Sequence, residues 1–134
     1  MKPRVIIADD EDFVRAFLKT IIEHLNYDLI DEVQSGDTAV EIILDKKPDI
    51  LLLDINMPIK TGLEVLGEMG DEVNNTCIIM ITAVTDNQSV RDSLAMGADH
   101  FIRKDNPPKK IVEIIKQTWE NFISKQESEE IKEF

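Results

Sequence analysis

Hydrophobic and polar positions follow two different patterns along the chain, one typical of strands and one typical of helices. Five short apolar runs occur, at 4–8, 27–33, 50–53, 76–81 and 100–103. Segments with apolar residues at helical spacing separate them, which is typical of repeated β-α-β units and a parallel sheet. Runs 4–8, 50–53 and 76–81 are continuously apolar, as expected for strands covered on both faces. Runs 27–33 and 100–103 are shorter or carry charge, which indicates the sheet edges.

The first two predicted helices each follow an acidic residue. Asp12 is expected to cap the first helix, and its inward residues recur at every fourth position: Phe13, Phe17, Ile21 and Leu25. Asp37 is expected to cap the second helix, whose inward residues are Ala39, Ile42 and Ile43.

Local signals mark the ends of three further helices. Thr61 to Glu64 and Thr85 to Gln88 both match the capping box, so the third and fourth helices should start there. Gly97 should stop the fourth helix. Pro107-Pro108 should open the fifth. Its expected inward residues are Ile111, Ile114 or Ile115, Thr118 and Phe122.

The length of 134 residues suits one α/β domain. We expect that domain at 1–125, followed by an acidic segment at 126–134 that either extends the last helix or frays. No apolar run approaches the ~20 residues of a membrane span, and no secretory signal is recognised at the start. The single cysteine, Cys77, lies in an apolar run and is expected to fill the core, which fits a reducing cytoplasmic location.

The formal net charge of −12 indicates which kinds of partner the chain can bind. Nucleic-acid binding draws most of its affinity from Lys and Arg contacts to phosphates, so direct binding to nucleic acid is disfavoured. The charge is compatible with a metal cation or a basic protein surface.

Polar residues follow four of the apolar runs. Asp9 and Asp10 follow the first, Asp54 the third, Thr82 the fourth and Lys104 the fifth. The carboxyl ends of parallel strands share one edge of the sheet, where such folds bind their ligands. Each residue alone is typical of a cap, a turn or a solvated charge, but together they predict one site.

Three neighbouring carboxylates resist joint ionisation, and a hard divalent cation resolves that conflict. Mg²⁺ binds through one or two carboxylates, waters and phosphate oxygens. Lys104 is then a point charge for an anion and Thr82 a hydroxyl donor. A carboxylate can itself accept a phosphoryl group. Asp54 ends the most apolar run, so it is the candidate acceptor.

These residues resemble the receiver domain of two-component response regulators, close in size to the single-domain chemotaxis type. The matching segments are ADD at 8–10, LLLDINMPIKTG at 51–62, ITA at 81–83, MGA at 96–98 and FIRK at 101–104. Gly62 falls eight residues after Asp54, and Lys104 falls twenty-two after Thr82, as in the family.

The resemblance implies a doubly wound, flavodoxin-like sheet of order 2-1-3-4-5 with five helices, and phosphotransfer to Asp54. It implies Mg²⁺ held by Asp10, Asp54 and the backbone carbonyl of Asn56, with Asp9 acting mostly through water. A domain of this kind is a phosphoprotein that promotes only its own phosphotransfer and dephosphorylation, and is not otherwise an enzyme.

The resemblance also implies roles in readout. Thr82 and Lys104 would contact the phosphoryl oxygens. Phe101 occupies the position of the aromatic switch residue, which turns inward when Thr82 moves and so alters the face of the fourth helix, fifth strand and fifth helix. Val84, two residues after Thr82, is expected to affect the lifetime of the acyl phosphate.

Partners follow from the same resemblance. The phosphoryl donor would be a sensor histidine kinase or a phosphotransfer protein. The phosphorylated form would be recognised by a downstream target or by an output domain missing from this sequence. A homodimer linked to phosphorylation stays open. No membrane partner is expected.

Two features depart from the family pattern. Asp105 and Asn106 separate Lys104 from the prolines, where the family has proline directly after the lysine. We therefore expect a trans bond after Lys104, or a cis bond enforced by surrounding contacts, because a non-proline cis bond costs about 2.5–4 kcal/mol. The switch residue is Phe where Tyr is commoner, so it has no hydroxyl for a target.

Two other functions compete with this one. A haloacid-dehalogenase-type phosphohydrolase also uses a nucleophilic Asp at a strand end, but it needs an acid two residues later, where Asn56 stands. A degenerate receiver would dock partners without taking phosphate, although all five site residues are retained here.

Overall fold

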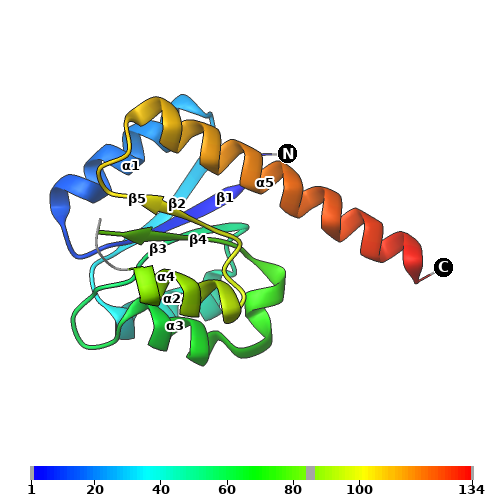
Figure 1. Ribbon diagram of the computed structural model, residues 1–134, viewed down its shortest axis with the longest axis horizontal. Helices are drawn as coiled ribbons and strands as arrows, with labels where there is room; N and C mark the ends of the chain where they lie inside the picture. The colour runs from blue at the N-terminus through cyan, green and yellow to red at the C-terminus, as the bar shows by residue number, and fades with distance from the viewer. Residues whose placement is uncertain (1, 84–86, 134) are drawn as a thin grey trace.

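The computed structural model describes residues 2–83 and 87–133, which contain one five-stranded parallel sheet of order β2-β1-β3-β4-β5 (Figure 1). The strands are β1 (Arg4–Ala8), β2 (Asp28–Val33), β3 (Ile50–Asp54), β4 (Cys77–Thr82) and β5 (His100–Arg103). Each lies within one residue of its predicted range, and β2 and β5 are the edges, as their composition indicated. The expected fold class and strand order are confirmed.

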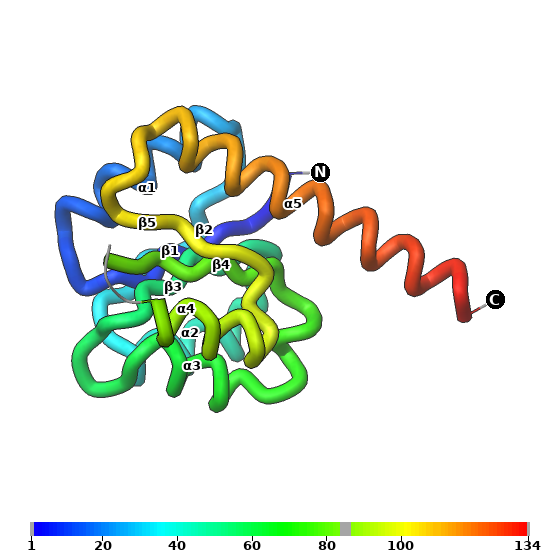
Figure 2. The backbone as a smooth tube through the Cα atoms, in the orientation of Figure 1, coloured from blue at the N-terminus to red at the C-terminus, as the bar shows by residue number. Residues whose placement is uncertain are grey.

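Helices cover both faces of the sheet. They are α1 (Asp12–His24), α2 (Gly36–Lys46), α3 (Gly62–Met69), α4 (Asn87–Ala95) and α5 (Pro108–Lys132), with a 3₁₀ segment η1 (Gly70–Asn75) after α3. The tube in Figure 2 and the ribbon in Figure 1 show α1 and α5 on one face and α2, α3 and α4 on the other. The capping box expected at Thr85 and the position of Val84 lie outside the described residues.

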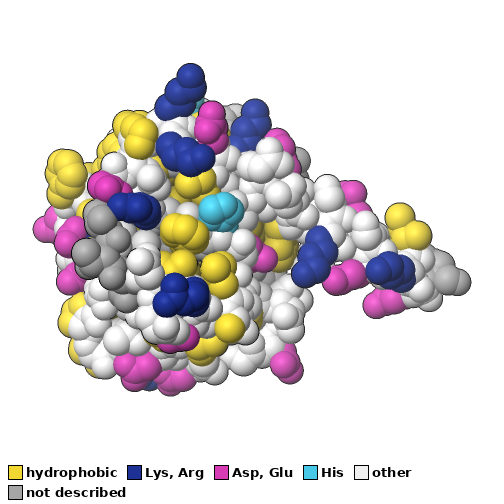
Figure 3. Space-filling view, in the orientation of Figure 1, with side chains coloured by type: hydrophobic (Ala, Val, Ile, Leu, Met, Phe, Trp, Pro, Cys, Tyr) yellow, Lys and Arg dark blue, Asp and Glu magenta, His cyan; other side chains and the backbone are white. Residues whose placement is uncertain are grey.

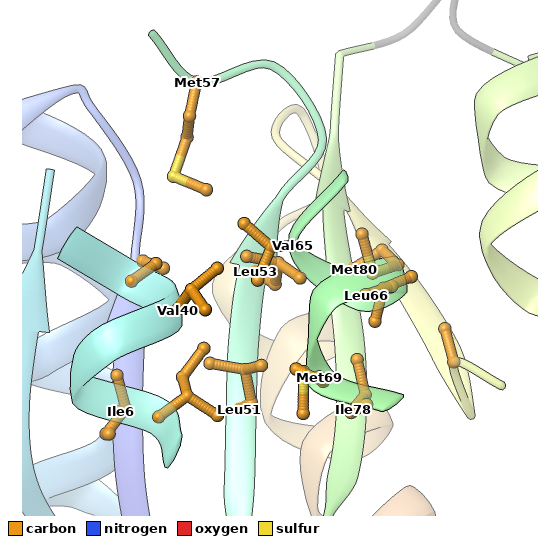
Figure 4. Packing of buried hydrophobic residues seen from close by; sticks show 14 of the residues in the cluster. Ile6, Val40, Leu51, Leu53, Met57, Val65, Leu66, Met69, Ile78 and Met80 are labelled. Atoms are coloured by element: carbon orange, nitrogen blue, oxygen red, sulfur yellow. The ribbon is translucent and has the colours of Figure 1, made fainter. Parts of the chain in front are cut away.

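The strands alternate their side chains between two hydrophobic clusters. In β1, Ile6 faces the cluster beneath α2, α3 and α4, whereas Val5 and Ile7 face the cluster beneath α1 and α5. Figure 4 shows Leu51 and Leu53 of β3 directed towards the α2 and α3 side. Because both faces are buried, the central strands are apolar at every position, which explains their continuous hydrophobic runs. Cys77 is fully buried in the second cluster, as predicted.

The predicted inward stripe of α1 is partly wrong. Phe13 is 82% exposed, and the buried residues of α1 are Arg15, Leu18, Ile21 and Ile22. A repeat of four advances about 400° in a helix of 3.6 residues per turn, so it drifts about 40° at each step. Phe13 is therefore rotated away from the face that carries Ile21.

The predicted capping residue was correct for one helix and wrong for two. Thr61 and Glu64 form both bonds of the capping box, as predicted. Asp12 and Asp37 do not cap, because each already lies inside the first helical turn. Asp12 pairs with Arg15 instead. Asp37 Oδ1 accepts a hydrogen bond of 2.8 Å from a neighbouring serine hydroxyl.

Helix α5 opens at Pro108, as predicted, and continues through residues 126–132 (Figure 1). Its inward residues Ile111, Ile114, Ile115 and Thr118 are buried. Gln126 Nε2 donates a 3.0 Å hydrogen bond to the carbonyl of Asn74, which joins the extension to η1. Beyond this contact the helix projects from the body and carries charged side chains of both signs (Figure 3).

Candidate phosphoryl-acceptor and metal site

Three aspartates meet at the carboxyl edge of the sheet. Asp9 and Asp10 follow β1, and Asp54 ends the neighbouring strand β3. Each offers a carboxylate oxygen within 4.8 Å of the other two. Asp9 and Asp54 are buried, whereas Asp10 is exposed. The three acids predicted to converge therefore do so.

Lys104 lies between these acids. Its Nζ is 3.3 Å from Asp9 Oδ2, 3.4 Å from Asp54 Oδ2 and 3.4 Å from Glu11 Oε2. Burial by itself would lower the pKa of Lys104, but the carboxylates of Asp54 and Asp9 outweigh it and the pKa is raised. The lysine is thus held as a cation at the mouth of the site.

Burial and mutual repulsion make these carboxylates difficult to ionise. Burial, followed by the charge of Asp9, raises the pKa of Asp54 to about 7, although Lys104 and the Asn56 amide favour its charged form. Burial likewise raises the pKa of Asp9. A bound cation would relieve this repulsion.

The donor set fits a hard divalent cation. Asp9 Oδ2 is buried and, within the described residues, has an ion-pair contact with Lys104 but no well-formed hydrogen bond. Such a buried oxygen is costly unless something satisfies it. The three side-chain donors are carboxylate oxygens, which suit Mg²⁺. The side chains expected to hold Mg²⁺ therefore form a cluster of the size and chemistry that a divalent cation needs.

The loop after Asp54 is shaped by close backbone contacts. Asn56 N–H donates to Asp54 Oδ1 at 3.2 Å, which places Asn56 beside the acceptor. A Cβ on Gly62 would meet the carbonyl oxygen of Asp54 at 2.4 Å, so only glycine allows α3 to start this close to the site. Lys60 N–H bonds to Pro58 O at 2.8 Å across Ile59, whose φ of 72° defines a strained three-residue turn.

Thr82 at the end of β4 and Lys104 directly after β5 lie at the same end of the sheet. Thr82 ends β4, is 2% exposed and donates its hydroxyl to Ala83 O at 3.0 Å. Lys104 N–H donates to Thr82 O at 2.8 Å, so the two expected phosphoryl-binding residues are linked through the backbone. Phe101 lies on β5 beside Met80 and is partly buried against the α2-α3-α4 cluster.

The segment after Lys104 departs from the family in sequence yet keeps a regular structure. Arg103 N–H donates to Asn106 Oδ1 at 2.9 Å, and Asn106 N–H returns a 2.9 Å bond to Arg103 O. Within the described residues every peptide bond is trans, including the bond after Lys104. Asn106 therefore closes the turn by its own side chain.

Two residues near the site were not predicted from the sequence. Glu11 contacts Lys104, and the buried Arg15 donates from Nη1 to the carbonyl of Asp9 at 2.8 Å. Glu11 belongs to the acidic run already noticed. Arg15 could have been suspected from its spacing of three residues after Asp12, which suits an ion pair on a helix.

Comparison with known proteins agrees with this geometry. The response regulator receiver domain family matches residues 5–116, so the chain belongs to that family. It is 36% identical over 115 residues to the chemotaxis protein CheY of Thermotoga maritima, covering 86% of this chain and 96% of that protein. It is 33% identical over 104 residues to the CheY of Halobacterium salinarum, covering 78% and 86%.

Solved structures show the same fold. The receiver domain of AraT from Geobacillus stearothermophilus superposes with a TM-score of 0.84 at 26% identity, covering 94% of this chain and 99% of that one. A CheY-like receiver domain protein from Methanospirillum hungatei gives 0.83 at 24% identity, covering 93% and 99%.

Family membership carries general properties. A phosphorylated aspartate and Mg²⁺ are general features of receiver domains, which are signalling switches rather than classical enzymes. Within the described residues, no helix is both long and apolar enough to span a membrane.

Proposed function

We propose that this chain is a phosphorylation-dependent switch in which Asp54 accepts a phosphoryl group from a histidine kinase or a histidine phosphotransfer protein. The observation that carries the proposal is the meeting of Asp9, Asp10 and Asp54 within 4.8 Å, with Lys104 in contact with the acceptor. The proposal places the receiver unit at 1–125 and treats 126–134 as an extension of α5. A cytoplasmic location belongs to it and is supported by the buried free thiol of Cys77.

The chemistry requires an ionised Asp54 beside an anionic donor. An Asp54 oxygen forms a bond to phosphorus as the donor's phosphorus–nitrogen bond breaks, and the electron pair of that bond returns to the imidazole. Lys104 offsets negative charge on the transferred group, and Thr82 supplies a hydroxyl donor to one phosphoryl oxygen.

Asp10, Asp54 and the carbonyl of Asn56 would hold Mg²⁺, with Asp9 close by and acting mostly through water. Bound Mg²⁺ would neutralise charge shared between the carboxylates and the phosphoryl oxygens. The raised pKa of Asp54 supports this requirement, because burial and its neighbour Asp9 leave the acceptor poorly ionised without a counter-charge.

Readout is proposed to run through Thr82 and Phe101. Lys104 is already held by three carboxylates, so Thr82 is the donor that can reorient when phosphate adds about −1.5 to −2 of charge. Its movement would open space for the partly buried Phe101 to turn inward. The face formed by α4, β5 and α5 would then change, and Figure 3 shows hydrophobic side chains exposed between β5 and α4 on that face.

This face is the proposed surface for a target protein or an output domain, and phosphorylation is the proposed control of any homodimer. A phosphohydrolase of the haloacid-dehalogenase type lacks support, since Asn56 fills the position of its general acid.

The test is mass measurement of the intact chain after exposure to a small acyl-phosphate donor, with Mg²⁺ or with EDTA. We expect one phosphoryl group, labile to hydroxylamine, in Mg²⁺ alone. Asp54→Asn should not be labelled, whereas Asp45→Asn, an exposed acid on α2, should be labelled as wild type. Stoichiometric labelling of Asp54→Asn, or equal labelling in EDTA, would contradict the proposal. A wild-type chain that never labels would support a degenerate receiver, and multiple turnover would support a phosphohydrolase.

The readout needs a separate measurement. Thr82→Ala should accept phosphate on Asp54 yet show reduced amide chemical-shift changes around Phe101 and α4. Full wild-type changes in this variant would exclude Thr82 as the link.

A further inference from the structure

Arg15 occupies a position that is unfavourable for an arginine. It lies in the first turn of α1 and is 8% exposed. Burying a charge is costly unless the charge is paired. A cation near a helix amino terminus also opposes the helix dipole. Specific contacts must therefore compensate for its placement.

Those contacts join three elements around the carboxyl edge of the sheet. Nη1 donates to the Asp9 carbonyl after β1 at 2.8 Å, in a buried hydrogen bond. Nη2 pairs with the Asp12 carboxylate on α1. Nε lies 3.8 Å from Glu32 Oε1 on β2. A long side chain on a helix points back towards the preceding turn, which explains how Arg15 reaches Asp9.

We infer that Arg15 is a positioning residue for the proposed metal site, and this inference rests on the proposed function. The Asp9 carbonyl belongs to the peptide unit that joins Asp9 to Asp10. Asp9 N–H donates to Val33 O at 3.1 Å, so the neighbouring strand holds the amide group of Asp9. Arg15 holds the carbonyl group of the same residue. Holding this peptide sets the direction in which the Asp10 carboxylate leaves the backbone.

A positioning role for Arg15 and its positive charge predict opposite changes in Mg²⁺ affinity when the residue is replaced. Arg15 is a cation near a cation site, so loss of its charge alone would strengthen Mg²⁺ binding. Loss of positioning would weaken it, because partners that orient metal ligands are typically worth about 10–100-fold in metal affinity. Measuring the Mg²⁺ dissociation constant therefore separates the two effects.

The experiment compares Arg15→Met and Arg15→Lys with wild type and with Lys19→Met. Lys19 is exposed one turn along the same helix, so its variant matches the loss of charge away from the site. Mg²⁺ affinity is measured by calorimetry on the full chain, and thermal unfolding is followed in EDTA. Phosphorylation rates by a small donor are measured across Mg²⁺ concentrations.

We expect Arg15→Met to weaken Mg²⁺ binding about tenfold, Arg15→Lys to weaken it less, and Lys19→Met to leave it unchanged. At saturating Mg²⁺ the phosphorylation rate of Arg15→Met should return to within about threefold of wild type, as expected for a loss in binding alone. Unfolding in EDTA should occur at a modestly lower temperature, because the substitution removes the buried hydrogen bond to the Asp9 carbonyl, whereas the carboxylates of Asp12 and Glu32 keep access to water.

Equal or tighter Mg²⁺ binding by Arg15→Met would overturn the inference. If that variant does not fold, Arg15→Lys decides, and wild-type affinity in it would overturn the inference. A wild-type chain that binds no Mg²⁺ would instead overturn the metal site itself.

Discussion

Aspartates lie at both ends of the parallel strands, where the strands begin (the amino edge) and where they finish (the carboxyl edge). The surroundings of these aspartates differ. At the amino edge, Asp49 precedes β3 and accepts from Arg4 N–H at 2.8 Å, while its own N–H donates to Arg4 O at 2.9 Å. Asp99 precedes β5 and makes the same reciprocal pair with Ile78, with both distances 2.8 Å. Each carboxylate there continues the hydrogen bonding of a strand that has just begun.

At the carboxyl edge the carboxylates face one another. Asp9, Asp10 and Asp54 share one small volume, and Lys104 lies within ion-pair distance of two of them. Two of the three are buried, and their pKa values are raised chiefly by that burial. The amino edge therefore uses aspartate to complete the fold, whereas the carboxyl edge keeps aspartate at a cost to stability. A local arrangement that costs stability is characteristic of a functional site.

The largest expected effect is on phosphoryl transfer at the carboxyl edge. Asp10→Ala should slow Mg²⁺-dependent labelling at least about a hundredfold, because it removes a proposed direct ligand, and partners that only orient metal ligands are already worth about 10–100-fold. Asp9→Ala should slow it less, since Asp9 is proposed to act mostly through water. Labelling rates by intact mass would check both, with Asp49→Asn as the matched control from the amino edge. Equal rates in Asp10→Ala and the control would remove the functional contrast between the edges.

The free energy of unfolding should also distinguish the two edges. Removing a carboxylate from the carboxyl edge should raise this free energy, although the same change abolishes labelling. In EDTA, Asp54→Asn should raise the free energy of unfolding at pH 8 by up to ~4 kcal/mol, the equivalent of a pKa raised from 3.8 to about 7. The pKa of Asp54 is about 7 in the folded chain and near 3.8 when unfolded, so the folded state holds the extra proton between these values. Wild-type stability should therefore fall as pH rises from about 4 to 7. The variant should show a smaller fall, because Asp9 and Asp99, whose pKa values are also raised, still titrate in it.

Urea unfolding of both chains between pH 4 and pH 8 would measure this. A wild type at least as stable as Asp54→Asn at pH 8, in EDTA, would show that the carboxylate cluster carries no such cost.

The two edges were not equally predictable from the sequence. Asp9, Asp54, Thr82 and Lys104 could be placed together because each follows an apolar run, and parallel strands bring their carboxyl ends to one edge. The reciprocal bonds of Asp49 and Asp99 were not predicted. The local sequence around an aspartate that precedes a strand does not show whether its carboxylate faces water or bonds to the neighbouring strand. The strand order determines which backbone N–H lies beside the carboxylate.

Packing produced the other differences. Phe13 is exposed and Arg15 buried, which reverses the usual preferences of these residues. Arg15 can be buried only because Asp9 O, Asp12 and Glu32 surround it, and Glu32 reaches it from β2. The contact with Glu32 depends on the tertiary fold, so the spacing of Arg15 from Asp12 within α1 could indicate their ion pair but not the burial of the arginine. The closed turn after Lys104 likewise depends on the side chain of Asn106.

A smaller effect is expected from breaking one reciprocal pair at the amino edge. Asp49→Ala should lower the free energy of unfolding by about 1 kcal/mol, because Arg4 N–H loses its acceptor in a partly buried position. Asp49→Asn keeps an acceptor oxygen and serves as the control. Mg²⁺-dependent labelling of Asp54 should be unchanged in both. Denaturant unfolding would check the stability, and equal values for the two variants would show that the pair does not stabilise the strand.

The smallest expected effect is at Asp99, which combines features of both edges. Loss of hydration raises the pKa of Asp99, while the hydrogen bond from Ile78 N–H opposes that rise. The folded state thus holds its proton to a higher pH than the unfolded chain, and this contribution to stability declines as pH rises above about 4. Asp99→Asn retains an acceptor for Ile78 and removes the titration, so its stability at pH 8 should differ by under about 0.5 kcal/mol. Compared with wild type, the variant should gain relative stability as pH rises above about 4. A gain at pH 8 as large as that of Asp54→Asn would mean that both edges bury their carboxylates at similar cost, and the contrast between them would be lost.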